Sequence, residues 1–149
     1  EKIDGIFSGY TDSVLPYMQQ VAARLDIPFW GNESNIAMCI DKLKFKQACE
    51  KAGVKTVPYI LVKEGRFDEN SMIMDYPVVV KPVDNSGSRG VYKVFDPKDL
   101  RKYYDKALSF SQKKEVLIEK LMPVDSEFSA YYLVGGGVFY APWATATSM

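Results

Sequence analysis

The segment V-V-V-K-P-V-D-N-S-G-S-R-G-V-Y-K-V, residues 78–94, constrains the fold more than any other part of the chain. An apolar run ends in a lysine and is followed by a loop with two glycines and two serines, and then by a second β-prone stretch. Successive side chains of a strand point to opposite faces, so Val79 and Lys81 share one face while Val78 and Val80 share the other. The segment therefore predicts a β-hairpin with one apolar face and a cation on the opposite face.

The lysine and the loop each allow two interpretations. Lys81 either reaches a bound anion or extends its charged end into solvent at the end of a strand. Gly87 and Gly90 permit positive φ, and N–H groups near Gly87 and Ser88 could surround an anion, although ordinary hairpin turns look alike. The chain lacks the G-x-x-x-x-G-K-[ST] pattern, so a P-loop nucleotide site is excluded.

The remaining pattern predicts further strands and helices. Strands are expected at 59–62, 77–81, 91–94 and 115–119, and a hairpin with Gly135–Gly137 as its turn at 128–134 and 138–141. Ser34 and Asp41 are candidate helix caps, Gly53 is a helix stop, and Asp96-Pro97 begins a further helix.

The first thirty or so residues predict a βαβ unit. Strands are expected at Ile3–Phe7 and Ile27–Trp30, with a helix between them that is capped by Thr11 or Ser13 and runs to about Leu25. Its apolar residues recur at three or four positions and are expected to form one packed face: Val14, Tyr17, Met18, Val21 and Leu25.

Composition excludes several classes of function. The 149 residues, 47% of them hydrophobic, suffice for one domain or parts of two. The 19 basic and 19 acidic residues cancel, so neither nucleic acid nor a membrane surface is an expected partner, and no apolar run approaches the roughly 18 residues of a spanning helix. Histidine is absent, which removes Ser-His-Asp and Cys-His nucleophiles. Cys39 and Cys49 are expected to pack within helices, which fits a reducing, cytoplasmic location.

Four short motifs follow one another along the chain: Asp41-Lys42, V-V-V-K-P before the loop G-S-R-G-V, I-E-K-L-M after a strand, and D-S-E-F. Their order and spacing resemble those of the ATP-grasp superfamily, whose members bind ATP between two α+β subdomains. The resemblance extends from about residue 3 to the end. It implies an α+β fold that is the N-terminal part of an ATP-grasp fold, preceded by the last βαβ unit of an α/β domain.

The resemblance implies a role for individual residues. Lys42 and Lys81 would contact ATP phosphates, and Gly87 and Ser88 would belong to the mobile loop that covers them. Glu119 or the Lys120 carbonyl would accept from the adenine amino group, the Met122 N–H would bond the ring, and Val79 and Met122 would line the adenine slot. Glu127 would hold the ribose hydroxyls. Taken singly, Glu119 and Lys120 could equally be an exposed charged pair, and Glu127 part of a solvated strand face.

The resemblance also implies a division of the chain: 1–34 as the tail of the preceding domain, 35–57 as a connecting helical segment, 58–120 as the lid subdomain and 121–149 as the start of the larger subdomain. The Mg²⁺ ligands of the superfamily lie on later strands. We therefore expect a fragment with half of an ATP site and no activity by itself.

The function implied for the parent protein is ATP-dependent activation of a small carboxylate as an acyl phosphate, followed by attack of an amine or similar nucleophile. ATP and Mg²⁺ would be the cofactors, and a homodimer is compatible with the resemblance. The carbamoyl-phosphate synthase and purine-pathway branches resemble the chain modestly more than the peptide-forming branches do. The alternatives are a non-catalytic nucleotide-binding module of the same fold, and an α+β interaction domain with a chance order of motifs.

Overall fold

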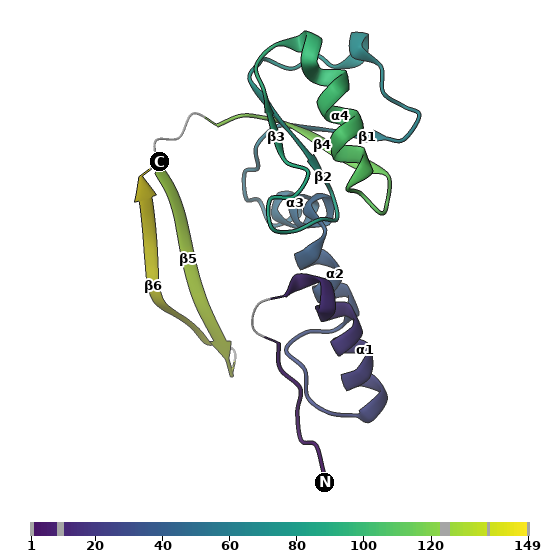
Figure 1. Ribbon diagram of the computed structural model, residues 1–149. Coiled ribbons are helices and arrows are strands. Elements are labelled where there is room, and N and C mark those ends of the chain that lie inside the picture. The colour runs from purple at the N-terminus through teal and green to yellow at the C-terminus, as the bar shows by residue number, and fades with distance from the viewer. Residues whose placement is uncertain (1, 9–10, 123–125, 137, 149) are drawn as a thin grey trace.

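The computed structural model describes residues 2–8, 11–122, 126–136 and 138–148. A four-stranded antiparallel sheet has the order β1-β4-β2-β3, and β5 and β6 form a separate two-stranded sheet (Figure 1). The strands are β1 (Tyr59–Lys63), β2 (Val78–Pro82), β3 (Tyr92–Val94), β4 (Glu115–Lys120), β5 (Ser126–Gly135) and β6 (Val138–Ser148). The α-helices are α1 (Leu15–Leu25), α2 (Glu33–Ile40), α3 (Lys42–Lys51) and α4 (Leu100–Ser109). Within these described ranges, no helix is long and apolar enough to cross a bilayer.

The cross-strand register places one set of apolar side chains under α4. Val78 and Val80 of β2 pair with Lys120 and Ile118 of β4, so Val78, Val80 and Ile118 point to the same side of the sheet. These residues form the buried core together with Val62, Val94, Val116, Leu100, Tyr104 and Ala107. Helix α4 therefore covers this face, as Figure 1 shows, and it does so with its buried residues Leu100, Tyr104 and Ala107.

The opposite face of the sheet carries the polar residues. Glu119 of β4 lies between Tyr59 of β1 and Val79 of β2 in the register, so these three side chains share a face. Lys81 lies two residues beyond Val79 and points the same way. The alternation predicted for residues 78–81 is confirmed, and the cation-bearing face is the one that α4 does not cover.

Local sequence signals account for several element boundaries. Asp41 caps α3 by accepting a hydrogen bond from the Lys44 N–H at 2.9 Å, as expected. Gly53 follows α3 with a φ of +76°, and Asp96-Pro97 begins the short 3₁₀ turn Pro97–Asp99 that leads into α4. The hairpin of β5 and β6 is also confirmed, with Gly136 at a φ of +57°, whereas Gly137 lies outside the described residues.

The N-terminal unit differs from the expectation. Ile3–Phe7 and Ile27–Trp30 are not strands, because a strand requires hydrogen bonds to a neighbouring strand and the described residues offer none there. Helix α1 is present, but neither Thr11 nor Ser13 caps it through its side chain, and α2 is capped by Asn32 rather than by Ser34. A capping box between Asn32 and Asn35 explains that shift, since each side chain accepts from the other's backbone N–H.

The apolar stripe of α1 is not a packed face. Leu15 and Ala22 are buried, whereas most of the expected residues are exposed: Val14, Tyr17, Val21 and Leu25. Among the described residues, helix α1 packs against α2 and not against a sheet, so only the narrow side that meets α2 is covered. The periodicity was correct for a helix, but the tertiary neighbour decided which side was buried.

Replacing Gly90 with alanine is expected to lower the free energy of unfolding by about 2 kcal/mol. The added Cβ would lie 2.9 Å from the Cβ of Phe110, and the φ of +78° strains any L side chain. Gly87→Ala is the matched control, because its φ is +64° but no heavy atom lies within 4 Å of the added Cβ; it should cost about 1 kcal/mol. Urea unfolding measures both, and equal losses would contradict a role for the Phe110 contact.

Candidate functional site

A cleft of about 590 Å³ opens on the polar face of the sheet, beside α3. We call it the lysine cleft, because four lysines and one glutamate supply its charged side chains: Lys42, Lys46, Lys55, Lys81 and Glu119. Its other lining residues are Cys39, Phe45, Cys49, Val54, Thr56 and Val57. Its size is ordinary for a small-molecule site, and its excess of cations favours an anionic ligand.

Glu119 is the buried anion of the lysine cleft. Its carboxylate is paired with Lys81 through Oε2 at 2.6 Å and with Lys46 through Oε1 at 3.2 Å. The Lys46 ammonium is close enough for ion pairing but is not directed for a hydrogen bond, so Oε1 receives none from the described residues. The side chain of Glu119 is only 8% exposed. The interpretation of Glu119 as half of an exposed charged pair is therefore wrong.

Lys46 is held by more than its ion pair. Its ammonium donates a hydrogen bond to the Val57 carbonyl at 3.1 Å and lies 5.1 Å from the centre of the Tyr59 ring. The side chain is 11% exposed, against 22% for Lys81. Lys46 thus joins α3 to both the 54–57 segment and the sheet, and it is the more confined of the two lysines that pair with Glu119.

Lys42 connects the first turn of α3 to the glycine-bearing loop. Its backbone N–H donates to the Val83 carbonyl at 2.9 Å, and its ammonium donates to the Asn85 carbonyl. Burial lowers the pKa of Lys42 below its usual value, and the nearby charge of Lys81 lowers it further. An anion that binds between two such cations relieves their mutual repulsion, so their proximity favours binding of an anion.

The loop after β2 is anchored at both ends and exposed between them. Asp84 accepts hydrogen bonds from the Ser111 hydroxyl at 2.7 Å and the Lys113 N–H at 2.8 Å, and Gly90 packs against Phe110. Gly87 and Ser88 are exposed and have φ values of +64° and +56°. Among the described residues, no acceptor receives their N–H groups. The loop tip therefore presents free backbone donors, as an anion-binding loop requires.

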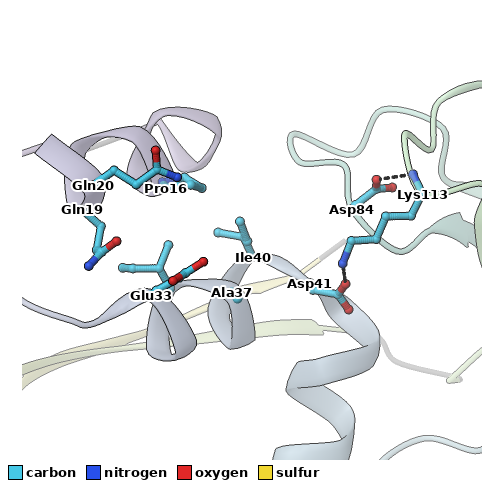
Figure 2. A pocket seen from close by; sticks show the side chains of 10 residues that line it. Pro16, Gln19, Gln20, Glu33, Ala37, Ile40, Asp41, Asp84 and Lys113 are labelled. Carbon is cyan, nitrogen blue, oxygen red and sulfur yellow. Dashed lines mark hydrogen bonds and ion pairs between the residues drawn. The ribbon is translucent and has the colours of Figure 1, made fainter. Parts of the chain in front are cut away.

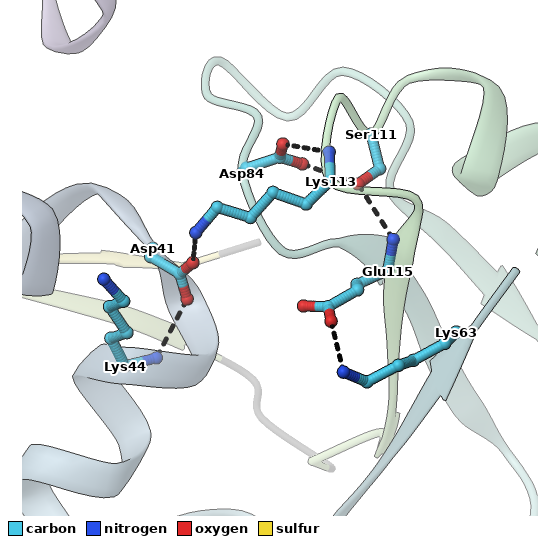
Figure 3. Close-up of polar contacts among 7 residues, drawn as sticks. All are labelled: Asp41, Lys44, Lys63, Asp84, Ser111, Lys113 and Glu115. Atoms are coloured by element: carbon cyan, nitrogen blue, oxygen red, sulfur yellow. Dashed lines mark hydrogen bonds and ion pairs between the residues drawn. The ribbon is translucent and has the colours of Figure 1, made fainter.

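A polar network holds this loop and α3 together (Figure 3). The ammonium of Lys113 pairs with the Asp41 carboxylate that caps α3, while the Lys113 N–H donates to Asp84. Burial acts to raise the pKa of Asp41, but hydrogen bonds from Lys113 and from the Lys44 N–H outweigh it, so the pKa lies below its usual value. The network keeps the helix that carries Lys42 and Lys46 in a defined position relative to the loop.

A second cavity of about 260 Å³ lies between α1, α2 and this network (Figure 2). Its walls are largely apolar on the α2 side, with Ile36, Ala37 and Ile40. Of its four charged residues, Asp41, Asp84 and Lys113 already contact one another, as the dashed contacts in Figure 2 show for Lys113, and the fourth, Glu33, is itself an anion. This cavity consequently offers less charge to an anionic ligand than the lysine cleft does.

Of the residues expected at the site, the structure brings Lys42, Lys81 and Glu119 together around the lysine cleft. Val79 shares their face of the sheet but does not line the cleft. The remaining expected residues stay apart from it: Gly87 and Ser88 at the loop tip, Lys120 exposed and 3.8 Å from Asp75, and Met122 49% exposed. Glu127 lies in β5, and its side chain falls outside the described residues.

Lys46 is the residue that the sequence reasoning missed. It lies four positions after Lys42, which is one helical turn, so both ammonium groups lie on the same side of α3. That spacing was the available signal. Only the contact between α3 and the sheet shows that this turn meets Glu119.

Comparison with known proteins identifies the architecture. The family model described as "D-ala D-ala ligase C-terminus" matches residues 48–129, which is more than half of the chain. The chain belongs to this family of ATP-grasp ligases. The superfamily and the α+β fold inferred from the four motifs are therefore confirmed.

Individual relatives agree with this assignment. The D-alanine–D-alanine ligase of Clostridium beijerinckii is 34% identical over 111 residues, which cover 72% of this chain and 36% of that protein. The carbamoyl phosphate synthase large chain of Vibrio cholerae is 27% identical over 82% of this chain and 12% of that protein. Carbamoyl phosphate synthase is thus among the relatives, as expected, but at lower identity, and the family model is that of the peptide-forming branch.

Solved structures show the same fold. The D-alanine–D-alanine ligase of Helicobacter pylori superimposes with a TM-score of 0.73 at 26% identity, over 85% of this chain and 39% of that chain. The L-amino acid ligase of Bacillus licheniformis has a TM-score of 0.79 at 20% identity, and the match covers 97% of this chain and 32% of that chain. The chain therefore spans about a third of the length of the ligases that it matches.

The described residues contain no cluster of potential metal ligands. Hard divalent cations are held mainly by carboxylate and carbonyl oxygens. Within the part of the chain that the structure describes, no group of three or more histidine, cysteine, aspartate or glutamate residues is arranged to hold a metal ion. Glu119, the carboxylate of the lysine cleft, is instead neutralised by lysines.

Asp41→Asn is expected to lower the free energy of unfolding at pH 7 by about 1 kcal/mol, a modest value because Lys113 is half-exposed and screened. Asparagine can still cap α3 but cannot pair with the Lys113 ammonium. The lowered pKa of Asp41 gives stability that is present above its ordinary value of 3.8 and is lost as the pH falls through the folded pKa. The deficit of the variant should therefore shrink in acid.

Urea unfolding at pH 7 and at pH 3 tests this expectation. Asp105→Asn is the control, because its pair with Arg101 at 3.0 Å is exposed and should contribute almost nothing. A deficit for Asp41→Asn that is the same at both pH values would contradict the ion pair with Lys113.

Proposed function

We propose that this chain forms the ATP-binding part of an ATP-grasp ligase that activates a carboxylate as an acyl phosphate for attack by an amine. One observation carries the proposal: the lysine cleft places the Lys42 and Lys81 ammonium groups on the polar face of the sheet, with a single glutamate as counter-charge. Phosphoryl transfer depends mainly on positioning and charge neutralisation, for which such a cleft is suited. A ligase active site needs no histidine for this step.

The proposed roles follow the geometry and the family. Lys42 and Lys81 bind the phosphates, and the free N–H groups of Gly87 and Ser88 close over them. Glu119, Lys120 and Met122 at the end of β4 hold the adenine ring, with Val79 beneath it, and Glu127 binds the ribose. The division at residues 34, 57 and 120 belongs to the same proposal, with 58–120 as the lid subdomain.

The relatives narrow the proposed substrate to amino acids. D-Alanine–D-alanine ligases and an L-amino acid ligase by name join amino acids, so both the carboxylate and the amine of the parent protein's reaction are proposed to come from amino acids. ATP supplies the phosphoryl group, and Mg²⁺ would neutralise phosphate charge when bound. The role proposed for Lys42, Lys81 and the loop tip is to bind and orient the nucleotide.

Lys81→Met in the full-length protein should raise the Kd for ATP by about tenfold to a hundredfold, because a charge-assisted contact to phosphate is lost. Isothermal titration calorimetry with ATP measures it. Lys102→Met is the matched control: this exposed lysine lies on α4, which covers the opposite face of the sheet, and its loss should leave the Kd unchanged. Equal affinities for wild type and Lys81→Met would remove Lys81 from the site.

Acyl phosphate formation has its own test. The full-length protein with ATP, Mg²⁺, a panel of D- and L-amino acids and hydroxylamine should accumulate an amino acid hydroxamate, because hydroxylamine attacks an acyl phosphate. The amino acid that gives hydroxamate identifies the carboxylate substrate. ATP binding without hydroxamate or ADP for any amino acid would indicate a nucleotide-binding module instead of a ligase.

A further inference from the structure

The buried carboxylate of Glu119 is shared by two lysines that differ in their freedom to move. Lys81 is paired with Oε2 at 2.6 Å, and this is the only contact made by its ammonium among the described residues. Lys46 contacts Oε1 at 3.2 Å, donates to the Val57 carbonyl at 3.1 Å and lies over the Tyr59 ring. Lys81 can therefore leave the carboxylate by rotating its own side chain, whereas Lys46 is retained by two other groups.

This difference matters when an anion enters the lysine cleft. If Lys81 turns to a phosphate, it ceases to neutralise Glu119, whose side chain is 8% exposed. A buried carboxylate without a partner is strongly unfavourable, and such a group takes up a proton unless another cation compensates it. Lys46 is the cation that remains in contact.

We propose that Lys46 is a positioning residue that keeps Glu119 ionised and in place while Lys81 transfers from Glu119 to the bound phosphate. This inference rests on the proposed ATP-binding function. Lys46 neither touches the nucleotide nor takes part in the reaction. It makes the release of Lys81 possible without protonation of the buried carboxylate.

The charged and titratable groups around Glu119 come from α3, β1 and β2, whereas Lys55 lines the same cleft from the 54–57 segment but is exposed and forms no ion pair with Glu119 among the described residues. Lys42 and Lys46 extend from α3, Lys81 from β2, and Tyr59 lies beside Glu119 on β1. The Lys42 ammonium donates to the Asn85 carbonyl, and in the proposed complex it would bind the same phosphates that attract Lys81. Tyr59 is a neutral group that cannot balance a carboxylate. The surroundings thus leave Lys46 as the compensating charge.

The sign of the pH dependence follows from proton counting. In Lys46→Met the free protein keeps the ionised Glu119–Lys81 pair. In the ATP complex the neutral adenine amino group can donate a hydrogen bond to Glu119 but cannot balance its charge, so the carboxylate must be protonated or remain without a cation. ATP binding then takes up a proton, so the Kd rises as the pH rises, by at most about tenfold per pH unit for one proton. In the wild type Lys46 stays paired with Glu119, so ATP binding takes up no additional proton and the Kd shows no additional rise with pH.

The test is calorimetric titration of the full-length protein with ATP between pH 6 and pH 8.5, in buffers of different ionisation enthalpy. Wild type and variant are compared at each pH, so that the ionisation of ATP itself cancels. Lys46→Met should show a steeper rise of Kd with pH and additional proton uptake, with affinity about tenfold lower than wild type at pH 8. Lys46→Arg should restore the wild-type profile because it returns the charge.

Two further variants separate this role from a purely structural one. Lys46→Gln keeps a polar N–H donor but carries no charge, so it should reproduce the slope of Lys46→Met even if the methionine variant folds poorly by circular dichroism. Adding Glu119→Gln to Lys46→Met removes the buried charge and should abolish the additional proton uptake.

The outcomes distinguish the two proposals. If the wild type binds ATP and Lys81→Met weakens binding, but Lys46→Met and Lys46→Gln follow the wild-type pH profile, the role of Lys46 is overturned and the proposed function stands. A pH-independent loss of affinity in both Lys46 variants would also overturn it, because that result indicates packing alone. If the wild type does not bind ATP at all, both proposals fail.

Discussion

The register between β2 and β4 is the constraint on which the rest of this structure depends. Because side chains alternate along each strand, pairing Val79 with Glu119 places Val78, Val80 and Ile118 on one face and Val79, Lys81 and Glu119 on the other. A shift by one residue would turn the charged side chains towards α4 and the valines towards solvent. Burial of the apolar face under α4 is thus what specifies the position of the charged groups.

The polar face illustrates a balance between stability and binding. Lys42, Lys46 and Lys81 approach one another, which is unfavourable in a folded protein without a ligand, although Glu119 pairs with Lys46 and Lys81, and Asp84 and Asp41 lie near Lys42. The ion pairs with Glu119 reduce this repulsion while the cleft is empty of phosphate. The remaining repulsion is relieved when an anion binds, so part of the binding free energy is already present in the arrangement of the protein.

The sequence predicted those elements whose pattern is local. The strands that begin at Tyr59, Val78 and Glu115 are short, largely apolar runs, and Asp41 and Asp96 cap helices through neighbouring backbone groups. Predictions that depended on distant partners were less successful. Among the described residues, the segments Ile3–Phe7 and Ile27–Trp30 have no neighbouring strand to pair with, and the apolar stripe of α1 does not pack against a sheet.

The candidate site shows the same division between local and distant information. Lys42 and Lys81 stood out because they occur within motifs, whereas the burial of Glu119 and its pairing with Lys46 depend on how α3 meets a strand more than seventy residues later. Such a contact has no signature in a single sequence. It follows from packing, and packing is decided by the whole chain.

The anchoring of the loop after β2 has a consequence for the entropy of closing it. Asp84 is hydrogen-bonded to Ser111 and Lys113, and Gly90 is packed against Phe110. Only the short stretch between Asp84 and Gly90 would therefore lose conformational entropy when the loop closes. Ordering a backbone costs about 1–2 kcal/mol of conformational entropy per residue. Few residues of a loop tethered close to its tip remain to be ordered, so the entropic cost of binding a ligand there is small. Lengthening the loop between these two tethers would therefore weaken ligand binding even if every contact to the ligand were kept.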